Sequence, residues 1–201
     1  EKTLVQMYRG GIFDHVGFGF SRYSTDSKWL VPHFEKMLYD NALLTTAYLE
    51  AYAVTGNTLY KTVAEKILTY VQREMTSPEG GVYCAQDADS EGEEGKFYTF
   101  TQSEIKSVLG STDGERFCGW FGVTGQGNFD GKNILNLIEN PEYSKTDNEL
   151  ERMLSLLRSY REKRTALHKD DKILTSWNAL MIAAYAKAYR ILGEDRYLKT
   201  A

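Results

Sequence analysis

The sequence predicts an all-α fold, a partial (α/α)6-type toroid of helical hairpins with short β-like loops at one pole. The first observation behind this prediction is an alternation of two kinds of helical segment. Residues 41 to 54 and 178 to 189 are apolar nearly all round, which is typical of helices covered on every side. Residues 58 to 75 and 149 to 164 place apolar side chains on one stripe only, which is typical of outer helices.

The second observation is an internal repeat. Residues 41 to 64 align without a gap on residues 178 to 201 and share Asn, Ala, Leu, Tyr and Gly positions. A second similarity links the Gly-Gly pairs at residues 10 and 80. The separation between these pairs is about half the separation between the segments that begin at residues 41 and 178. We therefore expect those two segments to lie two repeats apart. The inner helix between them would be residues 101 to 110.

Capping signals mark where two of these helices begin. Thr101 and Glu104 form the pattern of a capping box in front of the segment at 101 to 110. Thr146 and Glu149 repeat the pattern in front of the outer helix, so we expect that helix to open there.

Composition bounds the class of protein. With 201 residues, 42% of them hydrophobic, the chain can bury a sizeable core, and we expect a single partial toroid domain over residues 1 to 201. It begins with Glu1 and stops inside a periodic segment, so we expect a fragment that lacks the ring-closing repeats. A net charge of -4 without a basic face argues against a nucleic-acid partner. No apolar run suits a membrane span, and the isolated Cys84 and Cys118 suggest reduced thiols in the cytoplasm.

The toroid geometry predicts where a site would lie. Every segment between an outer helix and the next inner helix meets at the same pole of such a ring, where the inner helices point their positive ends. Those segments are residues 10 to 40, 76 to 101 and 165 to 177. They hold the candidate site residues His15, Arg22, Tyr23, His33, Glu35, Lys36, Asp40, Asp87, Asp89, His168, Asp170, Asp171 and Trp177.

The segment VPHFEKMLYD is the first source of candidates. If Pro32 begins a helical turn, His33, Lys36 and Asp40 share one face. There His33 would abstract a proton next to a sugar carbonyl, with Lys36 or Arg22 stabilising the oxyanion and a neighbouring carboxylate orienting the ring. The alternative is an ion-paired helix entrance that only holds the loop.

The acidic segment DADSEGEEGKF offers carboxylates. Asp87 or Asp89 would act as a general acid or base, or would accept hydrogen bonds from sugar hydroxyls. The spacing matches the first half of a calcium loop, but Tyr98 stands where the bidentate Glu is required, so no calcium is expected. The alternative is a solvated acidic turn.

The segment HKDDKILTSWN pairs His168 with Asp170 and Asp171 in front of an inner helix. Trp177 offers the flat apolar face on which sugar rings stack. Asn178 occupies the same repeat position as Asn41, and we expect both to hydrogen-bond backbone groups between hairpins.

Other sites are less well supported. Arg22 beside Tyr23 would hold a carboxylate or phosphate of a ligand, or would stack among aromatic rings. No HxH or HExxH spacing supports a metal site, and no cofactor is expected.

Three blocks carry a resemblance to a known family: GGIFDHVGFGFSRYSTDSKWLVPHFEKMLYDNALL, DADSEGEEGKFYTF and HKDDKILTSWNALM. They resemble the signature blocks of the YyaL and spermatogenesis-associated protein 20 family of thioredoxin-domain-containing proteins, over essentially the whole chain. The resemblance implies a toroid similar to N-acylglucosamine 2-epimerases and six-hairpin glycosidases, preceded by a thioredoxin-like domain that this chain does not contain. One departure is Phe18, where the family pattern has Gly.

Two functional hypotheses follow. In the first, the pole processes or binds a carbohydrate. The reaction would be epimerisation or isomerisation with His33 and His168 as acid and base, or glycoside hydrolysis with Asp87, Asp89 or Asp170. This chemistry is an analogy from the fold. In the second, the chain is a non-catalytic binding or scaffold module that partners the thioredoxin-like domain.

Overall fold

The computed structural model describes all 201 residues and is mainly helical, as the sequence predicts. Its strands are all two residues long. In chain order the elements are α1 (Lys2–Arg9), β1 (Tyr23–Ser24), β2 (Pro32–His33), β3 (Lys36–Met37), α2 (Leu38–Thr55), α3 (Thr58–Tyr70), a π-helical turn η1 (Val71–Met75), β4 (Ala85–Gln86), β5 (Asp89–Ser90), β6 (Glu93–Glu94), α4 (Gln102–Leu109), α5 (Ser111–Trp120), α6 (Asn148–Arg161), β7 (Lys169–Asp170), α7 (Thr175–Leu192) and α8 (Asp195–Thr200).

Helices α2 and α3 form the first hairpin. Gly56, at φ 70°, ends α2 in the left-handed conformation that glycine adopts without steric cost, and Asn57 then caps α3 by accepting from the backbone N–H of Leu59. The apolar segment and the amphipathic segment that follows it are therefore helices, as predicted, although the last five residues of the second are π-helical.

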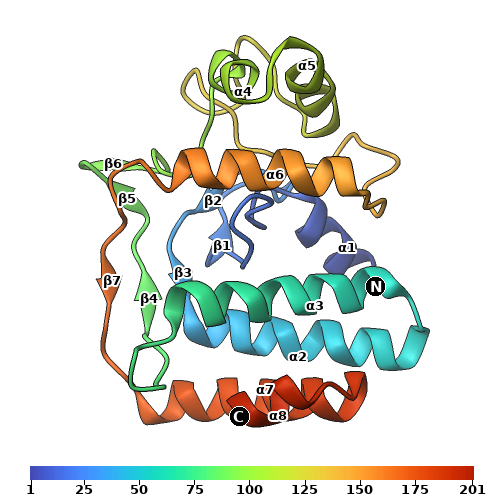
Figure 1. The fold of residues 1–201 in the computed structure, drawn as a ribbon, viewed down its shortest axis with the longest axis vertical. Coiled ribbons are helices and arrows are strands. Elements are labelled where there is room, and N and C mark those ends of the chain that lie inside the picture. Colours follow the sequence, from blue (N-terminus) through green and yellow to red (C-terminus); the bar gives the residue numbers. More distant parts are fainter.

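Helices α7 and α8 repeat this hairpin, and α7 packs directly against α2 (Figure 1). Gly193, at φ 74°, ends α7 as Gly56 ends α2. The internal repeat is thus present in the structure, but the expected second repeat between the two hairpins is wrong. The repeated apolar helices are neighbours because each covers the apolar side of the other.

Helices α4, α5 and α6 form a separate layer (Figure 1). Thr101 and Glu104 make the predicted capping box, but α4 packs on α5 and α6 and is not an inner helix beside α2. The second predicted capping box is wrong, because α6 is capped by Asp147, whose Oδ1 accepts from the N–H of Leu150 at 2.7 Å. A toroidal ring therefore remains a prediction for a longer chain.

The three segments predicted to meet at one pole do meet, in a three-stranded antiparallel sheet of order β3-β4-β7. Lys36 pairs with Gln86, and Gln86 pairs with Lys169. The predicted helical turn at Pro32 is wrong. Pro32 and His33 pair with β1, and Lys36 and Met37 pair with β4, so this stretch is extended until Leu38 begins α2.

Asn41 and Asn178 tie these segments to the helices. The Asn41 side chain accepts from Phe20 N at 2.8 Å and donates to Phe20 O at 3.0 Å. Asn178 makes the same pair of hydrogen bonds with Val82, at 2.8 and 2.9 Å. The predicted backbone-binding role of both asparagines is confirmed.

One large apolar core joins both layers and includes the buried rings of Tyr48 and Tyr185. His15 lies in it, against Tyr8, Phe13 and Phe121, and burial lowers its pKa to about 3. None of the helices combines the length and the apolar character that crossing a membrane requires.

Candidate functional site

The three-stranded sheet separates two polar clusters. Because neighbouring side chains of a strand point to opposite faces, Lys36, Gln86 and Lys169 face one side and line a cavity there. Their neighbours Glu35, Asp87 and His168 face the other side. We call the group Arg22, Tyr23, His33, Glu35 and Asp40 the outer cluster, and the group Asp14, Lys36 and Arg161 the buried cluster.

Glu35 is the centre of the outer cluster. Arg22 Nη1 donates to Glu35 Oε2 at 3.2 Å, and His33 Nε2 lies 3.6 Å from the same oxygen. The other ring nitrogen of His33 is 2.7 Å from Glu94 Oε1, and the His33 ring lies 5.2 Å from that of Tyr23. His33 is therefore held between two carboxylates.

Asp40 lies in the first turn of α2, half-buried, with Oδ2 buried and without a hydrogen-bond partner. Burial raises its pKa to about 6, while Arg22 opposes this shift and Glu35 adds to it. A carboxyl group with such a pKa exchanges its proton near neutral pH, as general acids and bases do.

Aromatic side chains border this region. Tyr39, next to Asp40, packs edge-on against Trp177 with ring centroids 4.8 Å apart. Trp177 is in the first turn of α7, so the adjacent N-terminal ends of α2 and α7 bring these rings together. The stacking surface predicted for Trp177 is thus beside the outer cluster.

Asp87 and His168 are adjacent across the sheet. Asp87 N donates to His168 O at 2.9 Å, and Asp87 Oδ1 accepts from Ala88 N at 2.7 Å. His168 is exposed. The sheet thus places both on the same face as Glu35, although the carboxylate of Asp87 is engaged with its own loop.

Other candidates lie outside the outer cluster. Asp89 and Asp171 are exposed, and Asp170 pairs with Lys172, which lowers the pKa of Asp170. His15 belongs to the aromatic core, so the expectation that all three histidines gather at the pole is wrong. Lys36 does not share a face with His33 and Asp40, because it is on a strand and points to the opposite side of the sheet.

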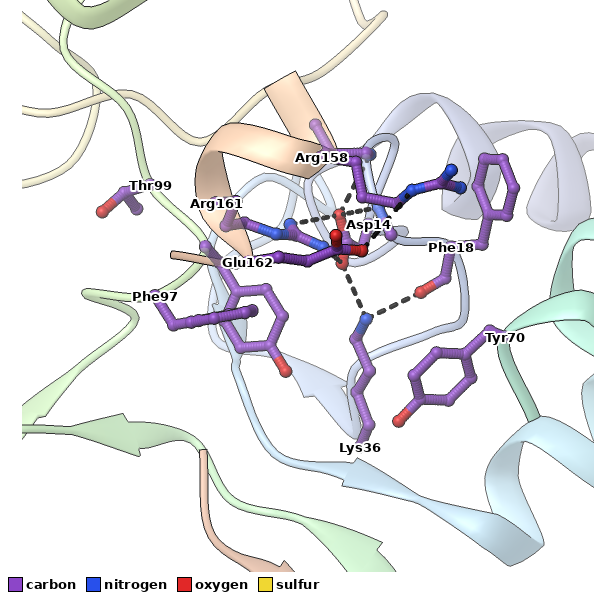
Figure 2. Close-up of polar contacts among 12 residues, drawn as sticks. Asp14, Phe18, Lys36, Tyr70, Phe97, Thr99, Arg158, Arg161 and Glu162 are labelled. Carbon is purple, nitrogen blue, oxygen red and sulfur yellow. Dashed lines mark hydrogen bonds and ion pairs between the residues drawn. The ribbon is translucent and has the colours of Figure 1, made fainter. Parts of the chain in front are cut away.

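The buried cluster is an ion triad that the sequence did not reveal (Figure 2). Asp14 accepts from Arg161 Nη1 and Nη2, both at 2.9 Å, and from Lys36 Nζ at 2.8 Å. Burial alone would raise the pKa of Asp14, but Arg161 and Lys36 hold it well below its usual range. Burial lowers the pKa of Lys36 to about 8 despite the charge of Asp14.

Close packing surrounds this triad. Lys36 Nζ also donates to Phe18 O at 2.7 Å and lies 4.5 Å from the ring centroid of Tyr70. A Cβ at Gly17 would clash with Arg161 Nη2 and Asp14 Oδ2, so a side chain there would disturb the triad. Of the three residues, only Lys36 is a candidate from the sequence, and no local pattern points to Asp14 or Arg161.

Phe18, the departure from the family pattern, has φ 68° and so occupies the left-handed region that favours glycine. Its ring compensates by contacting Lys66 and Arg73. We expect Phe18→Gly to be more stable than Phe18→Ala by about 1 kcal/mol, because both lose the ring but only glycine relieves the backbone. Urea unfolding of the two variants measures this; an alanine variant as stable as the glycine variant would contradict it.

No group of three or more His, Cys, Asp and Glu side chains is arranged to hold a metal ion.

No family model matches the chain. Curated relatives do match it: human spermatogenesis-associated protein 20 is 39% identical over 99% of this chain and 30% of that protein. The rat protein of the same name is 36% identical with the same coverage, and an uncharacterised protein of Caenorhabditis elegans is 33% identical over 100% of this chain and 32% of its own length. The resemblance predicted from the signature blocks is confirmed, and the chain spans 30% of the length of the human relative.

Proposed function

We propose that this chain, which is homologous over nearly its whole length to one segment of human spermatogenesis-associated protein 20, carries a carbohydrate-processing site at its outer cluster, where a proton is moved on a sugar-like substrate. The observation that carries the proposal is Asp40, a half-buried carboxyl group with a pKa of about 6 beside Arg22 and Glu35. We propose the same activity for the whole natural chain.

Asp40 is the general acid or base. An efficient proton-transfer group has a pKa near the working pH, because it must be both available in the right form and strong enough to react. Asp40 meets this condition, and no protein donor hydrogen-bonds its buried Oδ2 and stabilises the charged form.

Glu35 and Arg22 supply the charges around it. Glu35 is ion-paired with Arg22, and two nearby carboxyl groups in different environments are a recurrent arrangement for acid and base roles. Arg22 is 43% exposed, so its guanidinium has room to bind a ligand oxygen as well as Glu35.

The aromatic rings supply the binding surface. Trp177 and Tyr39 pack together next to Asp40, and Tyr23 packs against His33. Sugars present apolar ring faces and polar edges, so a wall of rings next to charged groups suits them.

The proposed step is proton abstraction next to a sugar carbonyl. The Asp40 carboxylate takes the C–H proton, and the electron pair of that bond forms an enediolate whose oxyanion Arg22 stabilises. If Asp40 returns the proton to the neighbouring carbon while the enediolate hydroxyl proton passes to the oxyanion, the product is the isomer. If water instead protonates the original carbon on its other face, the product is the epimer, and Asp40 then loses its proton to solvent. His33 holds Glu35 in place, whereas His168 and Asp87 would contact substrate hydroxyls.

The test is deuterium exchange. The whole natural chain is incubated in deuterated water with a panel of monosaccharides and uronic acids, and deuterium at the carbon next to the carbonyl is followed by NMR. We expect exchange with at least one sugar and its loss in Arg22→Gln. The matched control is Arg116→Gln, which removes another exposed, ion-paired arginine, partnered by Glu149.

Other outcomes would redirect the assignment. Release of reducing ends from a parallel panel of disaccharides, without deuterium incorporation, would replace epimerisation by glycoside hydrolysis. A sugar that binds but is never turned over would make the cluster a binding module, and a panel with neither binding nor exchange would overturn the carbohydrate assignment.

A further inference from the structure

On the other face of the sheet, the buried cluster opens onto a cavity of about 160 Å³ (Figure 2). Its floor is buried and its mouth, at Arg158 and Glu162, is exposed. The residues that carry its chemistry are Asp14, Lys36, Gln86 and Arg161 on the floor, and Arg73, Glu74, Arg158, Glu162 and Lys169 nearer the surface.

The lining has more positive than negative charge. Five cationic and three acidic side chains face the cavity, which leaves a net charge of +2. Two of the carboxylates are shared: Asp14 forms ion pairs with both Lys36 and Arg161, and Glu74 forms ion pairs with both Arg73 and Lys169. Of these cations only Lys36 and Arg161 are buried, and they share the single carboxylate of Asp14. Buried cations normally each have a counter-charge, so the floor of the cavity lacks one negative charge.

Two donors in the lining also lack acceptors. Arg161 binds Asp14 through both terminal nitrogens, which leaves its buried Nε without a partner, and an unmade hydrogen bond at a buried position costs about 1–3 kcal/mol. The Oε1 of Gln86 accepts from Tyr70 and Tyr98, and no hydrogen bond uses the amide nitrogen of Gln86.

We propose that this cavity binds a phosphate group, either the free anion or that of a small phosphate ester. Phosphate supplies negative charge to this cationic lining, and its oxygens accept hydrogen bonds from donors such as the free amide nitrogen of Gln86. The volume is below the roughly 300–1,000 Å³ of pockets for drug-sized ligands, so the ligand is small. The sheet separates this cavity from the outer cluster, and the proposal is independent of the carbohydrate function.

The test uses Gln86→Glu in the whole natural chain. A glutamate keeps an acceptor for both tyrosines but adds a carboxylate inside the cavity. We expect inorganic phosphate to bind saturably by calorimetry and to raise the Tm beyond the effect of sodium chloride at equal ionic strength. Gln86→Glu should weaken this binding at least about tenfold, because its carboxylate repels the anion and occupies the same donors.

The control is Gln126→Glu, which makes the same charge change on an exposed loop outside the cavity lining and should bind phosphate like the parent chain. If Gln86→Glu does not fold, Arg158→Gln combined with Lys169→Gln removes two cations at the mouth and should weaken binding as well.

Comparison of inorganic phosphate with glycerol 3-phosphate distinguishes the two sources. Tighter binding of the ester assigns the cavity to a phosphate monoester, and equal or weaker binding assigns it to the free anion. Absence of saturable binding of both probes, or unchanged binding of phosphate by Gln86→Glu, overturns the proposal.

Discussion

Asp14→Asn is expected to destabilise the chain by about 3–5 kcal/mol, because it removes the only carboxylate that pairs with Lys36 and Arg161 at the floor of the cavity. Their side chains are 1% and 6% exposed, so water does not replace the lost partner. Native domains are stable by about 5–15 kcal/mol, which makes this a loss of a large share of the total.

The sign of the pH dependence follows from the direction of the shift. The pKa of Asp14 is lower in the folded chain than in the unfolded chain, so its stabilising contribution is present above about pH 4 and is lost as the pH falls below that value. The difference between the parent chain and Asp14→Asn should therefore be largest at neutral pH and should shrink in acid.

Urea unfolding of the whole natural chain at several pH values measures this difference. The control is Asp113→Asn, which breaks an aspartate–arginine pair with Arg152 on the surface, where the partners are 27% and 51% exposed. Such pairs contribute about 0–1 kcal/mol. Equal losses for Asp14→Asn and Asp113→Asn would show that the buried triad is not a special source of stability.

Periodicity predicted α2 and α7 correctly, because the apolar residues that indicate each helix lie within that helix's own stretch of sequence. The repeat also located Asn41 and Asn178, whose equivalent backbone contacts reflect equivalent positions. The ring geometry correctly predicted that three distant segments meet at one place, although it did not predict that they pair as strands.

Long-range pairing was not predictable from local pattern. Lys36 has helical spacing to His33 and Asp40, yet β4 holds it in a strand, and Asp14 and Arg161 are 147 positions apart without any spacing rule that connects them. The sequence pattern assigns α4 and α6 to the repeat and does not predict α5. Amphipathic periodicity shows that a helix has an apolar face but not which neighbour covers that face.

Asp40→Asn is expected to abolish proton transfer while it stabilises the chain at neutral pH. Loss of a positioned acid or base lowers turnover by about 10²–10⁴-fold. The effect on stability has the opposite sign, because burial of an ionised carboxylate is unfavourable and asparagine carries no charge. A residue retained only for structure would not show this combination of effects.

The pH window can be stated from the pKa of about 6. Because the folded chain holds the Asp40 proton more tightly than the unfolded chain does, stability falls as the pH rises from about 4 to about 6. Asp40→Asn lacks this loss, so it should match the parent chain below about pH 4 and exceed it above pH 6, by about 1 kcal/mol once solvent screening of this half-exposed group is allowed for.

The matched control is Asp195→Asn, because Asp195 also lies in the first turn of a helix but is exposed. A carboxylate there interacts favourably with the helix dipole, so this variant should lose a few tenths of a kcal/mol at neutral pH and keep the deuterium exchange. If Asp40→Asn instead behaves like Asp195→Asn in both respects, Asp40 serves only as a favourable charge at the start of α2. The outer cluster would then have no proton-transfer group at Asp40, and the proposed proton transfer would be contradicted.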